Sequence, residues 1–217
     1  MDRMKPARSV TRRSALAACV AAASTAALSS CVPSGSAASS EAPKKGLAQY
    51  GFWMDSRVCA GCASCVAACR EANSTPDDCE ARRRIISYVF DRGESRFVSV
   101  SCMHCAQPAC VAVCPAGAIT KRADGIVEVD QSRCIGCKYC HASCPFGVPH
   151  YTSLGMDKCD CCLGAGIKPG KDPYCVQACP AKALQYGKLE DLHRRAEEAV
   201  GKVGLLESPT EPSFYLT

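Results

Sequence analysis

Residues 134–145 decide the fold, and they read Cys-Ile-Gly-Cys-Lys-Tyr-Cys-His-Ala-Ser-Cys-Pro. The four cysteines follow the spacing C-x2-C-x2-C-x3-C, and a proline comes directly after the last one. Three thiolates at this spacing lie on one tight loop, which lets them wrap three irons of a cubane. The fourth begins a helix that points away, so it ligates the other cluster of a pair. Each such motif therefore requires a partner motif elsewhere in the chain.

Three further groups of four cysteines accompany this stretch. The first group keeps the same spacing and consists of Cys59, Cys62, Cys65 and Cys69. The second has the spacing C-x2-C-x4-C-x3-C-P and consists of Cys102, Cys105, Cys110 and Cys114. The last is also followed by proline and consists of Cys159, Cys162, Cys175 and Cys179. With Cys134, Cys137, Cys140 and Cys144, these thiolates predict four [4Fe–4S] clusters with four cysteine ligands each.

Disulfide bonds and zinc are the alternative explanations for 20 cysteines in 217 residues. Such a density in a short chain indicates either a disulfide scaffold or a metalloprotein. Disulfides do not explain groups that end in C-x3-C-P, and bridging cysteines this close in sequence is geometrically poor. Structural zinc often uses two separated C-x2-C pairs, and only the fourth group could pass for such a site. The pattern favours iron–sulfur clusters.

Four cysteines fall outside these groups, namely Cys19, Cys31, Cys79 and Cys161. Cys79 lies in a polar stretch and is interpreted as a loop thiol. Cys161 lies between two predicted ligands, in Lys158-Cys159-Asp160-Cys161-Cys162, and could compete as a ligand. The prediction favours Cys162 because it keeps the x2 spacing.

Residues 1–31 are typical of an export signal. The basic stretch ends in Thr11-Arg12-Arg13-Ser14, and a mildly apolar, alanine-rich stretch of residues 15–28 follows it. Paired arginines before such a stretch resemble a twin-arginine signal. That pathway carries folded proteins, which suits clusters that are inserted before export. We expect the protein at the outer face of the cytoplasmic membrane or in the periplasm.

The end of this signal also resembles a bacterial lipobox. The residues are Leu28-Ser29-Ser30-Cys31, and a lipobox would place a lipid on Cys31. The alternative is an ordinary cleavage site with a chance cysteine. Residues 32–48 are rich in Ser, Ala, Pro and Gly, which predicts a flexible linker.

The charge distribution argues against a nucleic-acid partner. The formal net charge is +5, but residues 1–31 hold five basic residues against one acidic residue. The rest of the chain is therefore close to neutral, and no stacking aromatics alternate with basic residues there.

Short elements are predicted between the cysteine groups, and they indicate an α+β fold. Apolar and β-branched runs predict hairpins over 85–90 with 97–100 and over 118–120 with 126–129. Short helices should follow Cys65, Cys110, Cys140 and Cys175. A closing strand at 184–187 and an amphipathic helix at 189–200 complete the set.

The order of the motifs predicts two bacterial-ferredoxin-like two-cluster modules, one nested within the other. The second and third groups are adjacent, so they form an inner module over residues 99–150. The first and fourth groups then pair as an outer module made of residues 49–98 and 151–200. Residues 201–217 are predicted to be a C-terminal tail.

Several of these segments together resemble a known family. The cysteine order, residues 134–145, Met156-Asp157-Lys158-Cys159-Asp160 and the segment 50–55 resemble four-cluster electron-transfer subunits of molybdopterin oxidoreductases. The segments are similar to the dimethyl sulfoxide reductase and nitrite-reductase-associated types of these subunits, over about residues 49–190. The resemblance implies single-electron transfer between a quinone-reactive integral membrane subunit and a molybdopterin-containing catalytic subunit. An export signal on this chain itself resembles the nitrite-reductase-associated type.

The resemblance also implies which thiolates share a cluster. The first cluster takes Cys59, Cys62, Cys65 and Cys179. The second takes Cys102, Cys105, Cys110 and Cys144. The third takes Cys134, Cys137, Cys140 and Cys114. The fourth takes Cys159, Cys162, Cys175 and Cys69. All sixteen positions are cysteine, so no three-iron cluster is expected.

Other functions remain as alternatives to this interpretation. The chain could be a free exported polyferredoxin, or the electron-transfer subunit of a hydrogenase or a formate dehydrogenase. The formate dehydrogenase version is weakened because residues 188–217 contain no membrane helix. No catalytic residue is predicted, and the scattered histidines at 104, 141, 150 and 193 are interpreted as structural or hydrogen-bonding residues.

Overall fold

The computed structural model describes residues 48–89, 93–153, 155–201 and 203–217. The predicted export signal, Cys19, Cys31 and nearly all of the predicted linker lie outside the described residues. The elements in chain order are β1 (Tyr50–Met54), α1 (Ser64–Ala72), β2 (Arg84–Val89), β3 (Ser95–Val100), α2 (Ala109–Ala112), β4 (Ile119–Lys121), β5 (Val127–Val129), α3 (Tyr139–Ser143), β6 (His150–Thr152), β7 (Gly155–Asp157), α4 (Tyr174–Gln177), β8 (Leu184–Lys188), α5 (Leu189–Val200) and β9 (Phe214–Leu216). This mixture of short strands and short helices agrees with the predicted α+β class.

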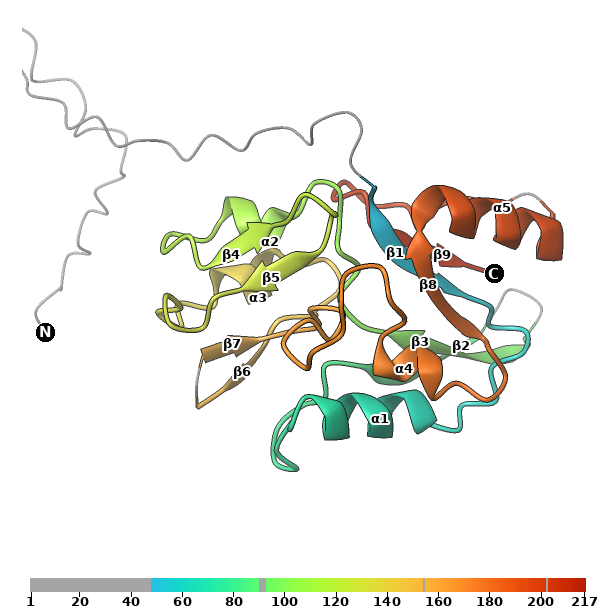
Figure 1. Ribbon diagram of the computed structural model, residues 1–217, viewed down its shortest axis with the longest axis horizontal. Helices are drawn as coiled ribbons and strands as arrows, with labels where there is room; N and C mark the ends of the chain where they lie inside the picture. Colours follow the sequence, from blue (N-terminus) through green and yellow to red (C-terminus); the bar gives the residue numbers. More distant parts are fainter. Residues whose placement is uncertain (1–47, 90–92, 154, 202) are drawn as a thin grey trace, which may run out of the picture. The chain divides into compact units, whose positions relative to one another are not determined.

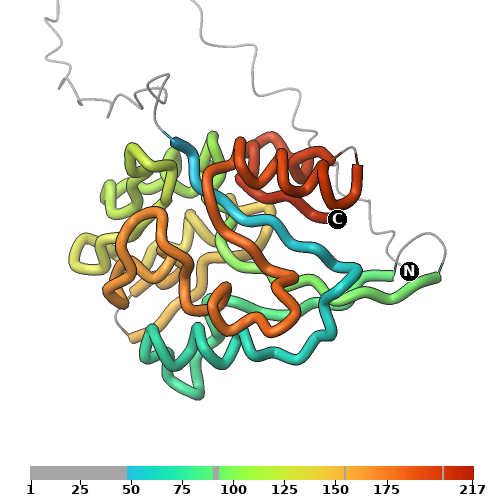
Figure 2. The backbone as a smooth tube through the Cα atoms, turned by 45° about the vertical axis from the view of Figure 1, so that its right-hand side comes forward, coloured from blue at the N-terminus to red at the C-terminus, as the bar shows by residue number. Residues whose placement is uncertain are grey.

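Strand β1 is the centre of a three-stranded sheet in the order β8-β1-β9. It runs antiparallel to β8 and parallel to β9, so segments from both ends of the described chain lie side by side (Figures 1 and 2). The side chains of β1 alternate between two faces, as the pleat of a strand requires. Phe52 and Met54 pack into the cysteine-rich core, whereas Trp53 packs against Leu192 and Ala196 of α5. The sheet therefore separates α5 from the thiols.

Strand β9 lies in the segment that was predicted to be a tail. Its three residues are too few to give a recognisable apolar pattern, but β1 leaves a row of backbone groups that need partners. The indole Nε1 of Trp53 donates to Oγ1 of Thr217 at 3.1 Å, and Oγ of Ser56 donates to the Thr217 carbonyl at 2.6 Å. Residues 213–217 are thus part of the sheet.

The described residues also form three antiparallel hairpins. β2 pairs with β3 and β4 pairs with β5, which confirms the two predicted hairpins. A third hairpin, β6 with β7, was not predicted because neither of its strands contains a run of β-branched residues. The predicted strand at 184–187 and helix at 189–200 are present as β8 and α5.

The four short helices begin one residue before a cysteine and pack in two pairs. Helix α1 lies against α4, which comes much later in the sequence, and α2 lies against α3. Figure 1 shows α1 with α4 and α2 with α3 as separate neighbours. The cysteines on these helices are therefore brought together between segments that are distant in the sequence.

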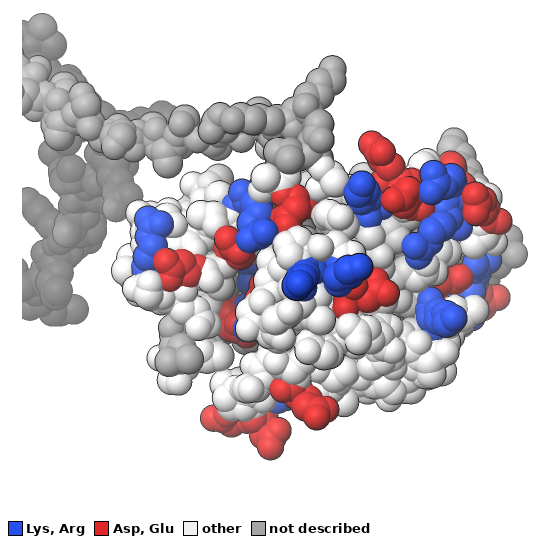
Figure 3. Space-filling model, viewed as in Figure 1, with Lys and Arg blue, Asp and Glu red and all other residues white. Residues whose placement is uncertain are grey.

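The surface carries charges of both signs. On the face shown in Figure 3, Lys and Arg side chains are interspersed with Asp and Glu, including over α5. Across the part of the chain that the structure describes, no helix has both the length and the hydropathy to span a bilayer.

Candidate metal centre

The loops that carry the first and third cysteine groups have the same backbone shape. Gly61 and Gly136 both have φ of 67°. Two residues later, Ala63 and Lys138 also adopt left-handed conformations, and they cap the N-termini of α1 and α3. Left-handed residues at these positions curl each loop around one point, and glycine fits the first position without steric cost. The same thiol-bearing loop is thus built twice.

The first loop forms one side of a cavity, which we call site 1. Four thiols line it, namely Cys59, Cys62, Cys65 and Cys179. Burial raises the pKa of Cys59, and the charges of its three sulfur neighbours act in the same direction. Cys179 comes from the end of the fourth motif, so two distant segments complete this site.

A second cavity, site 3, has the same composition. Its four thiols are Cys114, Cys134, Cys137 and Cys140. Three belong to the third motif, and Cys114 comes from the end of the second. Oη of Tyr151 lies 3.2 Å from Sγ of Cys140, so a hydroxyl group borders this site.

The remaining predicted ligands gather at two more places. Site 2 contains Cys102, Cys105, Cys110 and Cys144. Burial raises the pKa of Cys110 to about 12, and the charges of the other three thiols contribute to the rise. Site 4 contains Cys69, Cys159, Cys162 and Cys175. Burial likewise raises the pKa of Cys69 to about 12, and its three sulfur neighbours again contribute.

Cys161 is buried, and its sulfur atom lies within 4.8 Å of the sulfur of Cys159, a thiol of site 4. Sγ of Cys161 lies 3.3 Å from Nε2 of His104, and Cys161 raises the pKa of Tyr186 together with burial. Cys162 instead neighbours Cys69, which supports the prediction that Cys162 is the ligand.

His104 is a component that the cysteine spacing did not predict. Its ring nitrogen and the sulfur atoms of Cys159 and Cys161 lie within 4.8 Å of one another. The backbone N–H of Val127 donates to Nδ1 of His104 at 3.0 Å. Nδ1 is therefore an acceptor, and the neutral ring carries its proton on Nε2. His104 is placed to donate a hydrogen bond to sulfur rather than to ligate a metal.

Within the described ranges, hydroxyl groups of three residues outside the cysteine motifs also contact cysteine sulfur atoms. Oγ of Ser99 lies 3.2 Å from Sγ of Cys65, and Oγ1 of Thr210 lies 3.4 Å from Sγ of Cys105. The third is Tyr151 at site 3. Hydrogen bonds to sulfur and burial both adjust the reduction potential of a cluster. No local sequence signal indicates these contacts, because each joins residues brought together by folding.

The other histidines contact protein groups. Nδ1 of His141 lies 2.7 Å from the Pro149 carbonyl, and Nε2 of His150 lies 3.1 Å from Oδ2 of Asp157. Nε2 of His193 lies 3.2 Å from Oε1 of Glu197 on the same helix. These contacts are compatible with the structural roles predicted for them.

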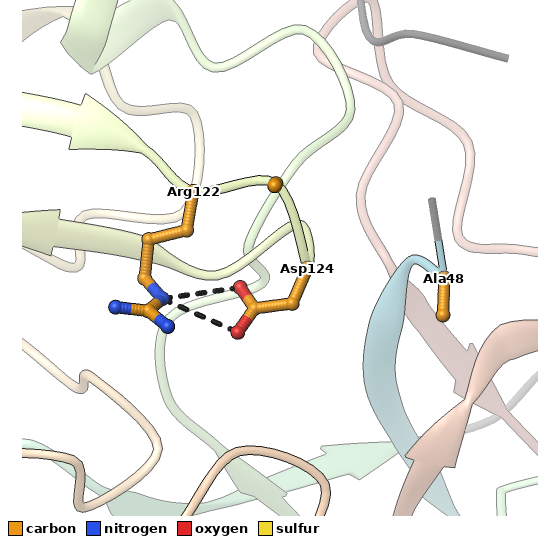
Figure 4. Close-up of a pocket in the computed structure, with 4 residues that line it drawn as sticks. Ala48, Arg122 and Asp124 are labelled. Atoms are coloured by element: carbon orange, nitrogen blue, oxygen red, sulfur yellow. Dashed lines mark hydrogen bonds and ion pairs between the residues drawn. The ribbon is translucent and has the colours of Figure 1, made fainter. Parts of the chain in front are cut away.

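A different pocket lies at the β4–β5 turn and contains no thiol. Ala48, Arg122, Ala123 and Asp124 line it (Figure 4). Nε of Arg122 lies 3.2 Å from Oδ2 of Asp124, so the two charges in the pocket neutralise each other. It offers no ligand set for a metal.

Every cysteine in the described ranges is a free thiol. Cys79 lies in the loop between α1 and β2, as predicted. Four groups of four thiols, two of them lining cavities, fit the iron–sulfur interpretation better than a disulfide scaffold. Residues 94–189 also match the family described as 4Fe-4S dicluster domain. The fold and the thiols thus define an iron–sulfur protein of the ferredoxin type that binds [4Fe–4S] clusters.

Similarity to known proteins narrows this class to one family. The chain is 44% identical over 161 residues to the B subunit of anaerobic dimethyl sulfoxide reductase from Shigella flexneri, which covers 68% of this chain and 77% of that protein. The corresponding subunit of Haemophilus influenzae is 39% identical over 163 residues, covering 69% and 78%. Protein NrfC of Escherichia coli (strain K12) is 42% identical over 149 residues, covering 66% and 67%. The chain belongs to this family of iron–sulfur electron-transfer subunits, which confirms the resemblance, and it is not itself a catalytic subunit.

Proposed function

We propose that this chain relays single electrons through four [4Fe–4S] clusters between a quinone-reactive membrane subunit and a molybdopterin-containing catalytic subunit. One observation carries the proposal: each of the four sites combines three thiols of one motif with the last thiol of another. Cys179 joins site 1, Cys69 joins site 4, Cys144 joins site 2 and Cys114 joins site 3. This exchange is the ligand pattern of two-cluster ferredoxins, used twice.

The helix pairs support the nested arrangement of two modules. Helix α1 carries Cys69, and α4, α2 and α3 end one or two residues before the other exchanged thiols, Cys179, Cys114 and Cys144. Residues 99–150 would form the inner module, and residues 49–98 with 151–200 the outer one.

Contacts between sites suggest the order 1–4–2–3 along the relay. Cys102 of site 2 and Cys159 of site 4 pack in one cluster of buried residues with Val148. The ligand exchange links site 1 to site 4 and site 2 to site 3. When bound, the clusters supply one-electron carriers, while the protein sets each potential through burial, charge and hydrogen bonds to sulfur.

The two ends of this order are the most accessible sites. Cys62 of site 1 and Cys137 of site 3 are the exposed thiols among the described cysteines. Ile135 and Tyr139 at site 3 are 69% and 61% exposed. Electrons would enter and leave at sites 1 and 3.

The relatives and the N-terminus support the proposed partners and location. Sequence similarity to the B subunit of dimethyl sulfoxide reductase favours a molybdopterin enzyme as the partner. NrfC is a relative in the same family. The twin-arginine-type signal supports export to the outer face of the membrane or the periplasm, with Cys31 as a site of lipid attachment. A free polyferredoxin, or a hydrogenase or formate dehydrogenase subunit, is the alternative.

Iron and acid-labile sulfide content tests the proposal first. The chain without residues 1–31, purified without oxygen, should contain about sixteen of each per chain. About eight would leave only two clusters and would overturn the four-cluster relay.

Co-purification of the full-length chain from its own cells tests the partner, because a chain recovered alone would favour the free carrier.

A further inference from the structure

Two positively charged side chains are almost completely buried close to the thiols. Arg83 is 1% exposed and Lys158 is 2% exposed. Burying a charge costs several kcal/mol unless an opposite charge compensates it. Neither residue forms an ion pair with a carboxylate in the described ranges. The adjacent Arg82, by contrast, lies 2.8 Å from Asp157 and 3.1 Å from Asp160.

Arg83 lies between sites 1 and 4. Burial lowers its pKa, but the charges of Cys175 and Cys159 in site 4 and of Cys65 in site 1 outweigh this and raise it. The guanidinium donates to Oγ of Ser99 at 3.0 Å and to Oγ of Ser101 at 2.8 Å. Thiolate charge is therefore the counter-charge that this buried cation faces.

Ser99 connects Arg83 to site 1. Its oxygen accepts from the guanidinium, so its own hydrogen is free to point at Sγ of Cys65, 3.2 Å away. Arg83 thus acts on site 1 through its charge and through the orientation of this hydroxyl group.

Lys158 occupies the equivalent position between sites 4 and 2. Its ammonium group donates to the carbonyl oxygens of Val127 and Cys159. Cys102 of site 2 packs in one buried cluster with Cys159, the neighbour of Lys158. Burial raises the pKa of Cys102, and the charge of Lys158 opposes that rise. At Cys110 the charge of Lys158 opposes the rise that burial causes. Two thiols of site 2 therefore lie within its field.

We propose that Arg83 and Lys158 are the buried counter-ions of the relay, with Arg83 shared by sites 1 and 4 and Lys158 shared by sites 4 and 2. The inference rests on the proposed four-cluster function. Four thiolates give each loaded site a net negative charge, and net charge is one determinant of cluster potential. A nearby cation stabilises the reduced state, so both residues raise the potentials of the sites they adjoin. At site 3, burial raises the pKa of Cys140, and neither cation is among the main influences on it.

Stepwise reduction of the cluster-loaded protein, monitored by electron paramagnetic resonance, gives the reduction potentials of the four clusters. The number of potentials that shift in each variant tests this assignment, so the individual signals need not be assigned to sites. Arg83→Gln should lower two of the four potentials, and Lys158→Gln should also lower two. One potential should fall in both variants (site 4), and one should fall in neither (site 3). We expect each change to reach a tenfold shift in the reduction equilibrium, or ~59 mV for one electron. Arg194→Gln on the exposed face of α5 is the matched control.

Several outcomes would overturn the inference. Four unchanged potentials, or four that shift equally, would show that these charges do not act on neighbouring sites. If the variants contain about sixteen irons per chain and their potentials are unchanged, only the counter-ion role is rejected. A low iron content in the unaltered chain would instead reject the four-cluster function itself.

Two further substitutions keep the inference testable if Arg83→Gln fails to bind clusters. Arg83→Lys keeps the charge and should load clusters with potentials near those of the unaltered chain. Ser99→Ala should lower one potential, that of site 1. If Arg83→Lys fails to load as Arg83→Gln does, the guanidinium is needed for its shape, and the counter-ion role is wrong.

Discussion

The sulfur atoms of Cys69 and Cys162 lie side by side, and Nδ2 of Asn73 is 3.8 Å from each of them. Cys161, next to Cys162 in the sequence, faces His104 instead. Both consecutive cysteines have left-handed backbones, with φ of 56° and 61°. This local turn sends two adjacent thiols to different neighbours, although sequence spacing alone left both as candidates.

Paired substitutions separate these two thiols. Cys162→Ala should lose the cluster at site 4, or about four irons per chain, because it removes a ligand. Cys161→Ala should keep the full iron content, since its sulfur contacts His104, Tyr186 and Cys159, whereas Cys162 is the thiol beside Cys69. Iron and sulfide analysis of both variants gives the answer, and the reverse result would assign Cys161 as the ligand.

Exchange of the last thiol between motifs makes a second prediction. Cys144→Ser should alter the cluster held by Cys102, Cys105 and Cys110, not the one held by its sequence neighbours in site 3. Cys114→Ser is the matched variant and should alter site 3. Low-temperature electron paramagnetic resonance distinguishes them, because the two variants should lose different signals. Loss of the sequence-local cluster in each case would reject the pairing.

The two equivalent glycines provide a matched test of the loops. An added methyl group at Gly61 would lie 2.8 Å from the Phe97 ring, whereas at Gly136 nothing lies within 4 Å. Gly136→Ala should cost about 1 kcal/mol of unfolding free energy, because only the left-handed backbone is strained. Gly61→Ala should cost more and impair loading of site 1. Phe97→Ala in the same chain should reduce the Gly61→Ala cost toward that of Gly136→Ala, and no reduction would exclude the ring as its cause.

Tyr151 should raise the potential of site 3. Burial and the hydrogen bond with Cys140 raise the pKa of Tyr151, so its hydroxyl stays protonated and can donate to sulfur at neutral pH. Tyr151→Phe should therefore lower one of the four potentials. Tyr139→Phe alters an exposed tyrosine at the same site and should leave all four unchanged. Equal effects of the two variants in a redox titration would contradict the role of this hydrogen bond.

Removing iron should destabilise the chain through its buried cations. Without clusters Arg83 loses its main counter-charge, and an unpaired buried charge costs about 3 kcal/mol. Arg83→Met should therefore unfold at higher urea concentration than the unaltered chain when both are iron-free under reducing conditions. With clusters bound the order should reverse. The same order in both states would mean that Arg83 is not balanced by the clusters.

The sequence predicts the local part of this fold well. Loop shape follows from cysteine spacing and from glycines such as Gly61 and Gly136, and the β2–β3 and β4–β5 hairpins follow from short apolar runs with turns between them. β9 was missed because its three residues form a strand only against β1. Ser99 and Tyr151 were missed as sulfur contacts for the same reason, and His104 was predicted to be structural or hydrogen-bonding without its sulfur partners. Their positions depend on packing between distant segments, which periodicity does not reveal.

The central position of β1 also affects how the protein is made. This strand leaves the ribosome early, but its partners β8 and β9 are synthesised more than a hundred residues later. At ordinary translation speeds, β1 waits roughly ten seconds or longer for them. During that time Phe52, Trp53 and Met54 have no sheet to cover them, so the nascent chain presents an aggregation-prone segment. We expect a truncated translation product that ends before β8 to be soluble only while a chaperone shields this strand.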